Sequence, residues 1–293
     1  MAETTADAGF IEGVPCWIDV QLPDVEAGKR FYGGLFGWRF EVAPGDGARE
    51  LWAYLGEDPV AALAPKPDGR MPTVWTLYFA TPDAVGLAGR IVAAGGQVVI
   101  PPTSFGDLGT TALVTDAEGA VFRLWEPGTH TGFRRRHEPG TFVWAELYTR
   151  DTQAANSFYA HLFHDALFGP DARPDFGRAP LTEVFPAEMP PHFLVHFGTD
   201  DVEAALETVG RLGGRVQVPP FETSYGNVAV VTDNQGASFA LLRRRGGEAW
   251  REPDQGAGRA ERQPDELRRH GDDPRQRDDD LRLRGDDLRE DEG

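Results

Sequence analysis

An internal duplication constrains the fold of this chain more than any other feature. Residues Gly13–Glu41 (GVPCWIDVQLPDVEAGKRFYGGLFGWRFE) align without a gap with residues Gly140–Phe168 (GTFVWAELYTRDTQAANSFYAHLFHDALF). A second, weaker repeat relates Val74–Pro102 to His192–Pro220. Four modules of one small design therefore follow one another along the chain, and the fold must accommodate them as equivalent units.

Each module predicts one strand, one helix and then three further strands. Residues 16–22 (CWIDVQL) alternate apolar and mixed positions, which is the period of a half-buried strand. Asp24 and Asp151 stand where a helix N-cap belongs, with apolar residues at helical spacing behind them. Gly95–Gly96 and Gly213–Gly214 stand where the second and fourth helices should end. Short apolar segments separated by the turns DAEG and DNQG then predict the closing strands.

This order of elements resembles the vicinal oxygen chelate superfamily, which includes glyoxalase I, bleomycin-resistance proteins and extradiol dioxygenases. The resemblance rests on Phe31-Tyr32 followed by LFGW, on the second helix that ends in Gly-Gly, and on the closing D-x-x-G turns. The opening PCWIDVQLPD and the four modules most resemble actinobacterial two-domain proteins of a glyoxalase-like or hydroxylase type. The resemblance implies an α+β fold of tandem βαβββ modules, forming two glyoxalase-like domains, each with a cup-shaped mixed sheet.

The repeats and the composition together predict five segments. We expect a flexible N-terminus over residues 1–11, a first glyoxalase-like domain over 12–130, a linker over 131–139 and a second such domain over 140–245. Residues 246–293 are rich in Arg and Asp and poor in large apolar side chains, so this tail is predicted to be disordered. It could be a solvated interaction tail or the product of a frameshift in a GC-rich coding sequence.

In the superfamily that the chain resembles, a divalent metal is held by His or Gln on the first strand of a module and by Glu on its last strand. The positions here that correspond to these ligands are Trp17, Thr76, Trp144, Leu194, Arg123 and Ala240. None of these side chains is a good metal ligand, and an arginine aimed at the site would repel a cation. We therefore expect no metal site and no cofactor.

The same strands predict a site for an organic ligand. Trp17, Asp19 and Gln21 share one strand face, and Trp144, Glu146 and Tyr148 share the equivalent face of the repeat. The opposite faces (Cys16, Ile18 and Val20; Val143, Ala145 and Leu147) suit packing on the helices. Aromatic walls with a few polar groups are typical of ligand pockets. The predicted ligand-binding residues are Trp17, Asp19, Gln21, Arg123, Trp144 and Tyr148.

Two polar pairs are expected to point into these cups, Arg123 with Asp19 and His196 with Glu146. A histidine beside a carboxylate can act as a general base near neutral pH, so Glu146 and His196 are the catalytic candidates. Each residue also has an ordinary structural interpretation. Trp17 and Trp144 could fill the core, Arg123 and Asp19 could simply neutralise each other, and His196 could be a satisfied buried group.

Composition bears on partners, redox state and location. A formal net charge of -18 and a pI near 4.8 disfavour binding to nucleic acid or to anionic membrane surfaces. Cys16 is the one cysteine, so no internal disulfide can form, and residues 1–13 lack the pattern of a secretory signal. We expect a cytoplasmic monomer or homodimer.

The sequence leaves three functions open. The first is a metal-free protein that binds a small organic molecule, of the bleomycin-resistance type, with a role in resistance or secondary metabolism. The alternative is a lyase, hydroxylase or dioxygenase-like enzyme acting on a small carbonyl or aromatic substrate. The third is a purely structural or partner-binding module.

Overall fold

A computed structural model describes residues 11–44, 50–69, 72–169, 172, 175–182 and 189–245. The expected flexible N-terminus, apart from residue 11, and the expected Arg/Asp-rich tail lie outside the described residues. Within the described part of the chain, no helix is long and apolar enough to cross a membrane.

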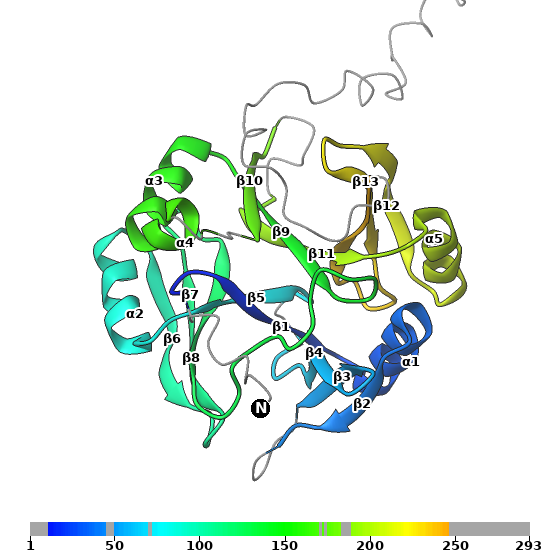
Figure 1. Ribbon diagram of the computed structural model, residues 1–293, viewed down its shortest axis with the longest axis horizontal. Coiled ribbons are helices and arrows are strands. Elements are labelled where there is room, and N and C mark those ends of the chain that lie inside the picture. Colours follow the sequence, from blue (N-terminus) through cyan, green and yellow to red (C-terminus); the bar gives the residue numbers. More distant parts are fainter. Residues whose placement is uncertain are drawn as a thin grey trace, which may run out of the picture. The chain divides into compact units, whose positions relative to one another are not determined.

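The first two modules form one mixed sheet of eight strands (Figure 1). Its order, β2-β3-β4-β1-β5-β8-β7-β6, places the first strands of the two modules side by side at the centre. The elements of this half are β1 (Pro15–Leu22), α1 (Val25–Phe36), β2 (Arg39–Val42), β3 (Leu51–Leu55), β4 (Asp58–Pro65), β5 (Trp75–Ala80), α2 (Ala84–Ala93), β6 (Gln97–Ser104), β7 (Gly109–Thr115) and β8 (Val121–Pro127).

The last two modules form a second mixed sheet, with the order β10-β9-β11-β14-β13-β12. In the third module only residues 169–175 separate the last helix from β10, too few for a hairpin like β2–β3 at that place. The elements of this half are β9 (Phe142–Thr149), α3 (Thr152–Leu162), α4 (His164–Phe168), β10 (Phe176–Pro180), β11 (His192–Gly198), α5 (Val202–Arg211), β12 (Arg215–Glu222), β13 (Gly226–Thr232) and β14 (Ser238–Arg244). The two mixed sheets confirm the expected fold class, whereas the exact domain bounds stay a prediction.

Helices α1, α2, α3 and α5 begin at aspartate N-caps. The side chains of Asp24 and Asp151 accept hydrogen bonds from the first turns of α1 and α3, and Asp83 and Asp201 do the same for α2 and α5. Each N-cap aspartate thus fixes the point where a strand gives way to a helix. The first strand of each module therefore ends shortly before an N-cap aspartate.

Register makes the two sheets equivalent at their centres. In the first sheet Trp17 pairs with Tyr78 across antiparallel strands, and Tyr78 pairs with Arg123. In the second sheet Trp144 pairs with His196, and His196 pairs with Ala240. The duplicated sequence therefore builds two related cups with different side chains at the same positions.

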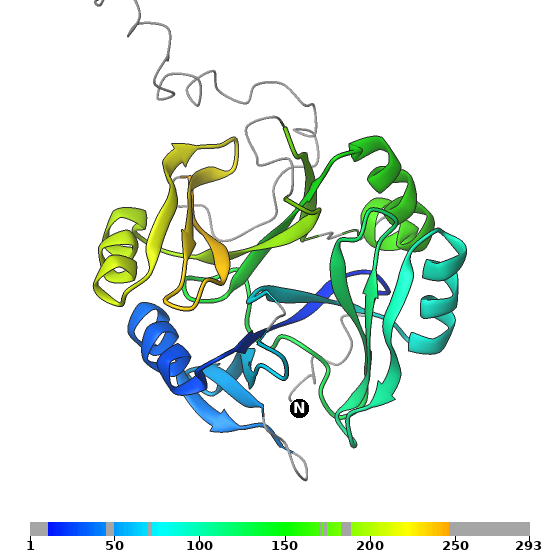
Figure 2. The same ribbon diagram turned by 180° about the vertical axis from the view of Figure 1, so that it is seen from behind.

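One apolar core joins the two halves. It includes Ile18 and Val20 from the first sheet and Ala145 and Leu147 from the second. The helices of different halves also pack together, with α1 beside α5 and α2 beside α3 (Figures 1 and 2). Burial of this shared apolar surface holds the two sheets together.

The expected split of strand faces is wrong at one position in each copy. Cys16 belongs to the cluster of buried residues on the cup side of the first sheet, and Val143 belongs to the corresponding cluster of the second. Irregular register explains both cases, because the pairing shifts between Pro15 and Trp17 in β1, and between His196 and Phe197 opposite β9. A bulge inserts one residue, so strict alternation fails there.

Candidate functional site

The cup of the first sheet contains a cavity of about 710 Å³. Clefts of this size take small organic ligands. Strands β1, β3, β5, β7 and β8 supply much of its lining, and the segments that flank them supply the rest. The aromatic and polar side chains that line it are Trp17, Trp52, Tyr78, Trp125, Asp19, Gln21, Glu50, Lys66, Thr111, Arg123 and His130.

Aromatic rings wall this cavity. The rings of Trp17 and Trp52 lie 5.7 Å apart between centroids, and His130 packs 4.5 Å from each of them. The indole Nε1 of Trp125 donates a 2.8 Å hydrogen bond to the carbonyl oxygen of His130. That bond anchors the segment after β8 over the cup. Trp17 thus lines the cavity and is also buried in an apolar cluster. It can therefore serve both as a wall of the pocket and as part of the core.

Two ionisable side chains, Asp19 and Arg123, line the cup. Asp19 is only 3% exposed, and burial raises the pKa of its carboxyl, against the opposing influence of Arg123 and of hydrogen bonds from Tyr78 and Thr76. The guanidinium of Arg123 lies 5.6 Å from the centre of the Tyr78 ring. Asp19 and Arg123 therefore lie close enough to interact electrostatically, as the sequence predicts. Asp19 Oδ1, an acceptor, and Arg123 Nε, a donor, have no hydrogen-bond partner among the described residues.

Four buried polar atoms of the cup have no hydrogen-bond partner among the described residues. They are Asp19 Oδ1, Thr111 Oγ1, Arg123 Nε and His130 Nε2. Leaving such groups unpaired costs free energy, and proteins usually avoid it. All four atoms belong to residues that line one cavity, where a bound molecule would be within reach of them.

Two further groups in the cup have shifted protonation equilibria. Burial, with the nearby charge of Asp19, raises the pKa of Glu50 to about 8. Burial and the charge of Arg134 lower the pKa of His130 to about 4. At neutral pH the cup therefore offers a protonated carboxyl and a neutral imidazole.

The cup of the second sheet is built from different groups. The indole Nε1 of Trp144 donates a 2.9 Å hydrogen bond to Glu146 Oε2, and burial raises the pKa of Glu146 to about 7. Burial also raises the pKa of Tyr148, to about 12, and its ring stacks on His192 at 5.5 Å. Gly177 lies against both Trp144 and Glu146, where a Cβ atom would come within 2.7 Å of the indole.

The predicted pair of Glu146 and His196 does not form a hydrogen bond in this structure. His196 is 2% exposed, its Nδ1 lies 3.1 Å from the carbonyl oxygen of Leu194, and burial lowers its pKa to about 4. The carboxyl of Glu146 instead bonds to Trp144. The acid and base roles of these two residues stay a prediction.

Comparison with known proteins identifies the family. Residues 16–124 match the model of the Glyoxalase/Bleomycin resistance protein/Dioxygenase superfamily. "Putative glyoxylase CFP32" of Mycobacterium tuberculosis (strain CDC 1551 / Oshkosh) is 35% identical over 252 residues, which cover 80% of this chain and 96% of that protein. "Anthracycline biosynthesis protein DauV" of Streptomyces sp. (strain C5) is 33% identical over 267 residues, covering 80% and 95%. The chain belongs to this superfamily.

A solved structure shows the same fold. The Mn(II)-bound glyoxalase from Novosphingobium aromaticivorans superposes with a TM-score of 0.57 at 14% sequence identity, over 83% of this chain and 84% of that one. At this identity the likeness concerns the fold alone. One fold hosts many functions, so the side chains of the cups determine which function this chain can have.

The metal expected in many members of the superfamily does not fit the residues present here. Arg123, which the sequence predicts at a closing-strand ligand position, has its guanidinium in the cup beside Tyr78. Trp17, which the sequence predicts at a first-strand ligand position, packs against Trp52 and His130. Among the described residues no three His, Cys, Asp or Glu side chains are grouped so as to hold a metal ion.

Several residues of the first cup were missed from the sequence. Tyr78 and Trp125 could have been found, because each lies two residues from Thr76 or Arg123, whose positions the sequence singles out. Thr111 lies on β7, for which the sequence predicts no site residue. Trp52 and Glu50 lie on or next to the hairpin strand β3, which has no counterpart in the repeat. His130 lies in the segment that follows β8, and no local pattern there indicates a site.

Proposed function

We propose that the protein binds a small aromatic molecule in the cup of the first sheet, without a resident metal. The observation that carries this proposal is the group of unpartnered buried polar atoms inside an aromatic cavity. Aromatic walls favour a planar ligand, because ring faces and edges contribute contact area and specific geometry together. The polar atoms then fix its orientation.

The polar atoms define the class of ligand. Arg123 Nε donates, and a carbonyl or anionic oxygen would be its partner, in a bond strengthened by the charge. Asp19 Oδ1 accepts, so a phenolic hydroxyl suits it, while Thr111 can do either. An aromatic ring system that carries both carbonyl and hydroxyl groups, such as a hydroxyquinone, satisfies these atoms together.

The relatives support a role in secondary metabolism. One of them is named as a protein of anthracycline biosynthesis, and its likeness extends over 80% of this chain. Sequestration of a polycyclic aromatic compound would serve either its biosynthesis or tolerance of it. We therefore propose a binding protein for a secondary metabolite of this chemical class.

Calorimetric titration with the hydroxyanthraquinone emodin tests the proposal. Wild-type protein should bind emodin at one site, and Trp17→Ala should weaken binding by about 1–3 kcal/mol, the burial energy of a large apolar side chain. Trp144→Ala is the matched control, because it makes the same change at the equivalent position of the other cup. Equal losses in both variants, or a loss in Trp144→Ala alone, would contradict the assignment to the first cup. Melting temperatures of both variants separate loss of binding from loss of fold.

Proton-transfer catalysis is the second candidate, favoured by Glu50, a carboxyl that stays protonated at neutral pH and faces the cavity. In the other cup, Glu146 and His196 are the acid and base that the sequence proposes. Isomerisation of the adduct of methylglyoxal and glutathione is the direct assay for a small carbonyl substrate. Turnover that Glu50→Gln or Glu146→Gln abolishes would favour an enzyme, whereas a rate equal to background would favour a binding protein.

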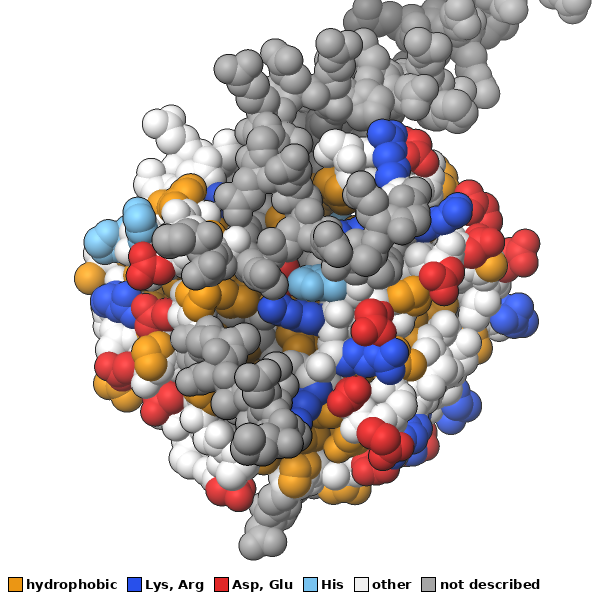
Figure 3. Space-filling model, in the orientation of Figure 1, with side chains coloured by type: hydrophobic (Ala, Val, Ile, Leu, Met, Phe, Trp, Pro, Cys, Tyr) orange, Lys and Arg blue, Asp and Glu red, His pale blue; other side chains and the backbone are white. Residues whose placement is uncertain are grey.

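We further propose that the protein acts on small molecules in the cytoplasm, as a monomer or homodimer, and not on nucleic acid or membranes. On the face shown in Figure 3, acidic and basic side chains are interspersed, without a continuous basic band among the described residues of that face. The net charge of -18 points the same way.

A further inference from the structure

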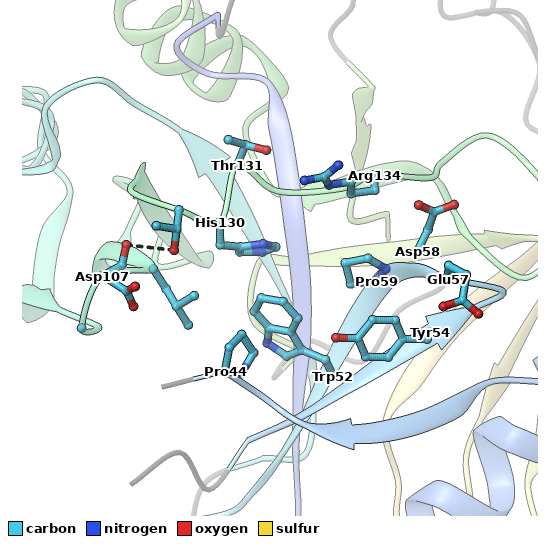
Figure 4. A pocket seen from close by; sticks show the side chains of 13 residues that line it. Pro44, Trp52, Tyr54, Glu57, Asp58, Pro59, Asp107, His130, Thr131 and Arg134 are labelled. Carbon is cyan, nitrogen blue, oxygen red and sulfur yellow. Dashed lines mark hydrogen bonds between the residues drawn. The ribbon is translucent and has the colours of Figure 1, made fainter. Parts of the chain in front are cut away.

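A second cleft, of about 800 Å³, adjoins the cup of the first sheet (Figure 4). It is lined by the hairpin β3–β4, by the loop before β7 and by the segment after β8. The two hollows share part of their lining. The residues common to both are Pro44, Trp52, Gly106, Leu108 and His130. A ligand seated in the cup could therefore extend into the cleft.

His130 stands at the junction of the two hollows. Its ring projects into the cleft above Trp52, as Figure 4 shows, and its centroid lies 4.5 Å from that of the indole. The side chain is buried, at 8% exposure, yet Nε2 has no hydrogen-bond partner among the described residues. A polar atom of a ligand that spans both hollows would satisfy it.

The chemistry of the cleft differs from that of the cup. Its outer part carries charged side chains, with Asp58 and Arg134 toward one end and Asp107 toward the other (Figure 4). The hydroxyl of Thr131 adds a donor and an acceptor, whereas that of Thr129 donates to the carbonyl oxygen of Asp107 at 3.1 Å and can only accept. Carboxylates accept hydrogen bonds from hydroxyls and guanidinium donates to them, so this part suits a group rich in hydroxyls.

We propose that the cleft is a second subsite, which receives a hydroxylated, non-aromatic substituent such as a sugar ring on the aromatic ligand of the cup. The proposal rests on the proposed function and names the ligand class more closely, as an aromatic glycoside. Tyr54 and Trp52 supply apolar surface for the saturated ring. Asp58 is the acceptor expected to select its hydroxyls, because Glu57 already lies 3.4 Å from the guanidinium of Arg39.

Titration with a matched pair of probes, emodin and its β-glucoside, tests the subsite. Wild-type protein should bind the glucoside about tenfold more tightly than emodin, the effect expected of an added hydrogen bond to a charged group. Asp58→Asn should remove most of this preference and leave the affinity for emodin unchanged. Glu203→Gln, at an exposed position on α5, removes one carboxylate elsewhere and is the control for net charge.

The outcomes separate the two proposals. Emodin bound equally well with and without the sugar, or a preference for the glucoside that Asp58→Asn leaves intact, would overturn the subsite alone. Binding of neither probe would contradict the proposed function, and the subsite with it. A preference for the glucoside that Asp58→Asn loses and Glu203→Gln keeps would support the subsite.

Discussion

The hydroxyl of Tyr32 on α1 donates a 2.8 Å hydrogen bond to Oδ2 of Asp233, in the turn between β13 and β14 of the other sheet. The equivalent bond joins Tyr159 on α3 to Asp116 at 3.0 Å, in the turn between β7 and β8. Both pairs are buried. The tyrosine of each Phe-Tyr pair therefore binds the closing turn of the opposite half.

The neighbouring residue of each turn extends this contact. Gln235 accepts from the backbone nitrogen of Asp24 and donates to its carbonyl oxygen, both at 2.8 Å. Glu118 accepts from the backbone nitrogen of Asp151 at 3.2 Å. Each D-x-x-G turn thus holds both the N-cap residue and the tyrosine of a helix from the other half. The duplication has produced two copies of one interface.

Removing either tyrosine hydroxyl should destabilise the protein. We expect Tyr32→Phe and Tyr159→Phe each to lower the free energy of unfolding by about 1–3 kcal/mol, because each leaves a buried carboxylate oxygen without its donor. Tyr32→Phe should be the more costly, since Tyr32 Oη also accepts a 3.1 Å hydrogen bond from Trp75 Nε1. Urea denaturation measures both changes.

Tyr54→Phe is the control for loss of a phenolic hydroxyl at a partly exposed site, and it should change the free energy by less than about 0.5 kcal/mol. Wild-type stability in Tyr32→Phe and Tyr159→Phe would show that these bonds do not hold the halves together.

Sequence patterns predict local structure well in this chain and long-range pairing poorly. The aspartate N-caps and the order of elements follow from nearby residues, so they could be read directly. The D-x-x-G turns were also recognised as turns. Their role as partners of Tyr32 and Tyr159 could not be predicted from the sequence. Each hydrogen bond joins modules of opposite halves, and no spacing rule links those positions.

In the site, too, local patterns predict some residues and tertiary packing positions the others. Trp17, Asp19, Gln21 and Arg123 line the first cavity as expected, since alternation and the repeat place them on one face. Trp52 lies on the hairpin strand β3, and His130 lies in the segment after β8. The repeat duplicates neither of these parts. Their position depends on tertiary packing, such as the bond from Trp125 to the His130 carbonyl.

Arg123 should discriminate between anionic and neutral ligands. In an Asp19→Asn background, Arg123→Met should weaken binding of an anthraquinone carboxylate by about tenfold or more, and binding of the matched carboxamide much less. The background matters because Arg123→Met alone would leave Asp19 buried without its positive neighbour, which costs about 3–5 kcal/mol when a buried pair is broken. Asp19→Asn alone is the reference, and titration calorimetry of both probes is the measurement. Equal weakening of carboxylate and carboxamide would exclude the proposed contact.

Purified protein should carry far less than one equivalent of nickel, zinc, iron or manganese. The reason is that the sequence predicts Arg123 and Trp17 at the ligand positions of the superfamily. Both line the cup, neither is a good metal ligand, and a guanidinium repels a cation. Elemental analysis after purification without chelator gives the metal content. Stoichiometric metal that Asp19→Asn releases would show that other side chains of the cup have taken over the ligand role.

Stability should fall as the pH rises from 6.5 to 8, because of the buried glutamates. Burial raises the pKa of Glu50 from 4.5 to about 8, and that of Glu146 to about 7, so between pH 4.5 and 8 the native state holds protons that the unfolded state has lost. Stability contributed by a raised pKa is complete below 4.5 and is lost as the pH rises through the folded value. Burial has the opposite effect at His130 and His196, because it lowers their pKa values from 6.5 to about 4. Their contribution to stability therefore rises with pH between about 4 and 6.5 and changes little above that.

Melting temperatures between pH 6.5 and 8 therefore report on the glutamates. Glu50→Gln, whose amide does not titrate, should lose less stability over this range than wild type. Parallel curves for wild type, Glu50→Gln and the exposed control Glu203→Gln would rule out a buried, protonated Glu50 in the cup.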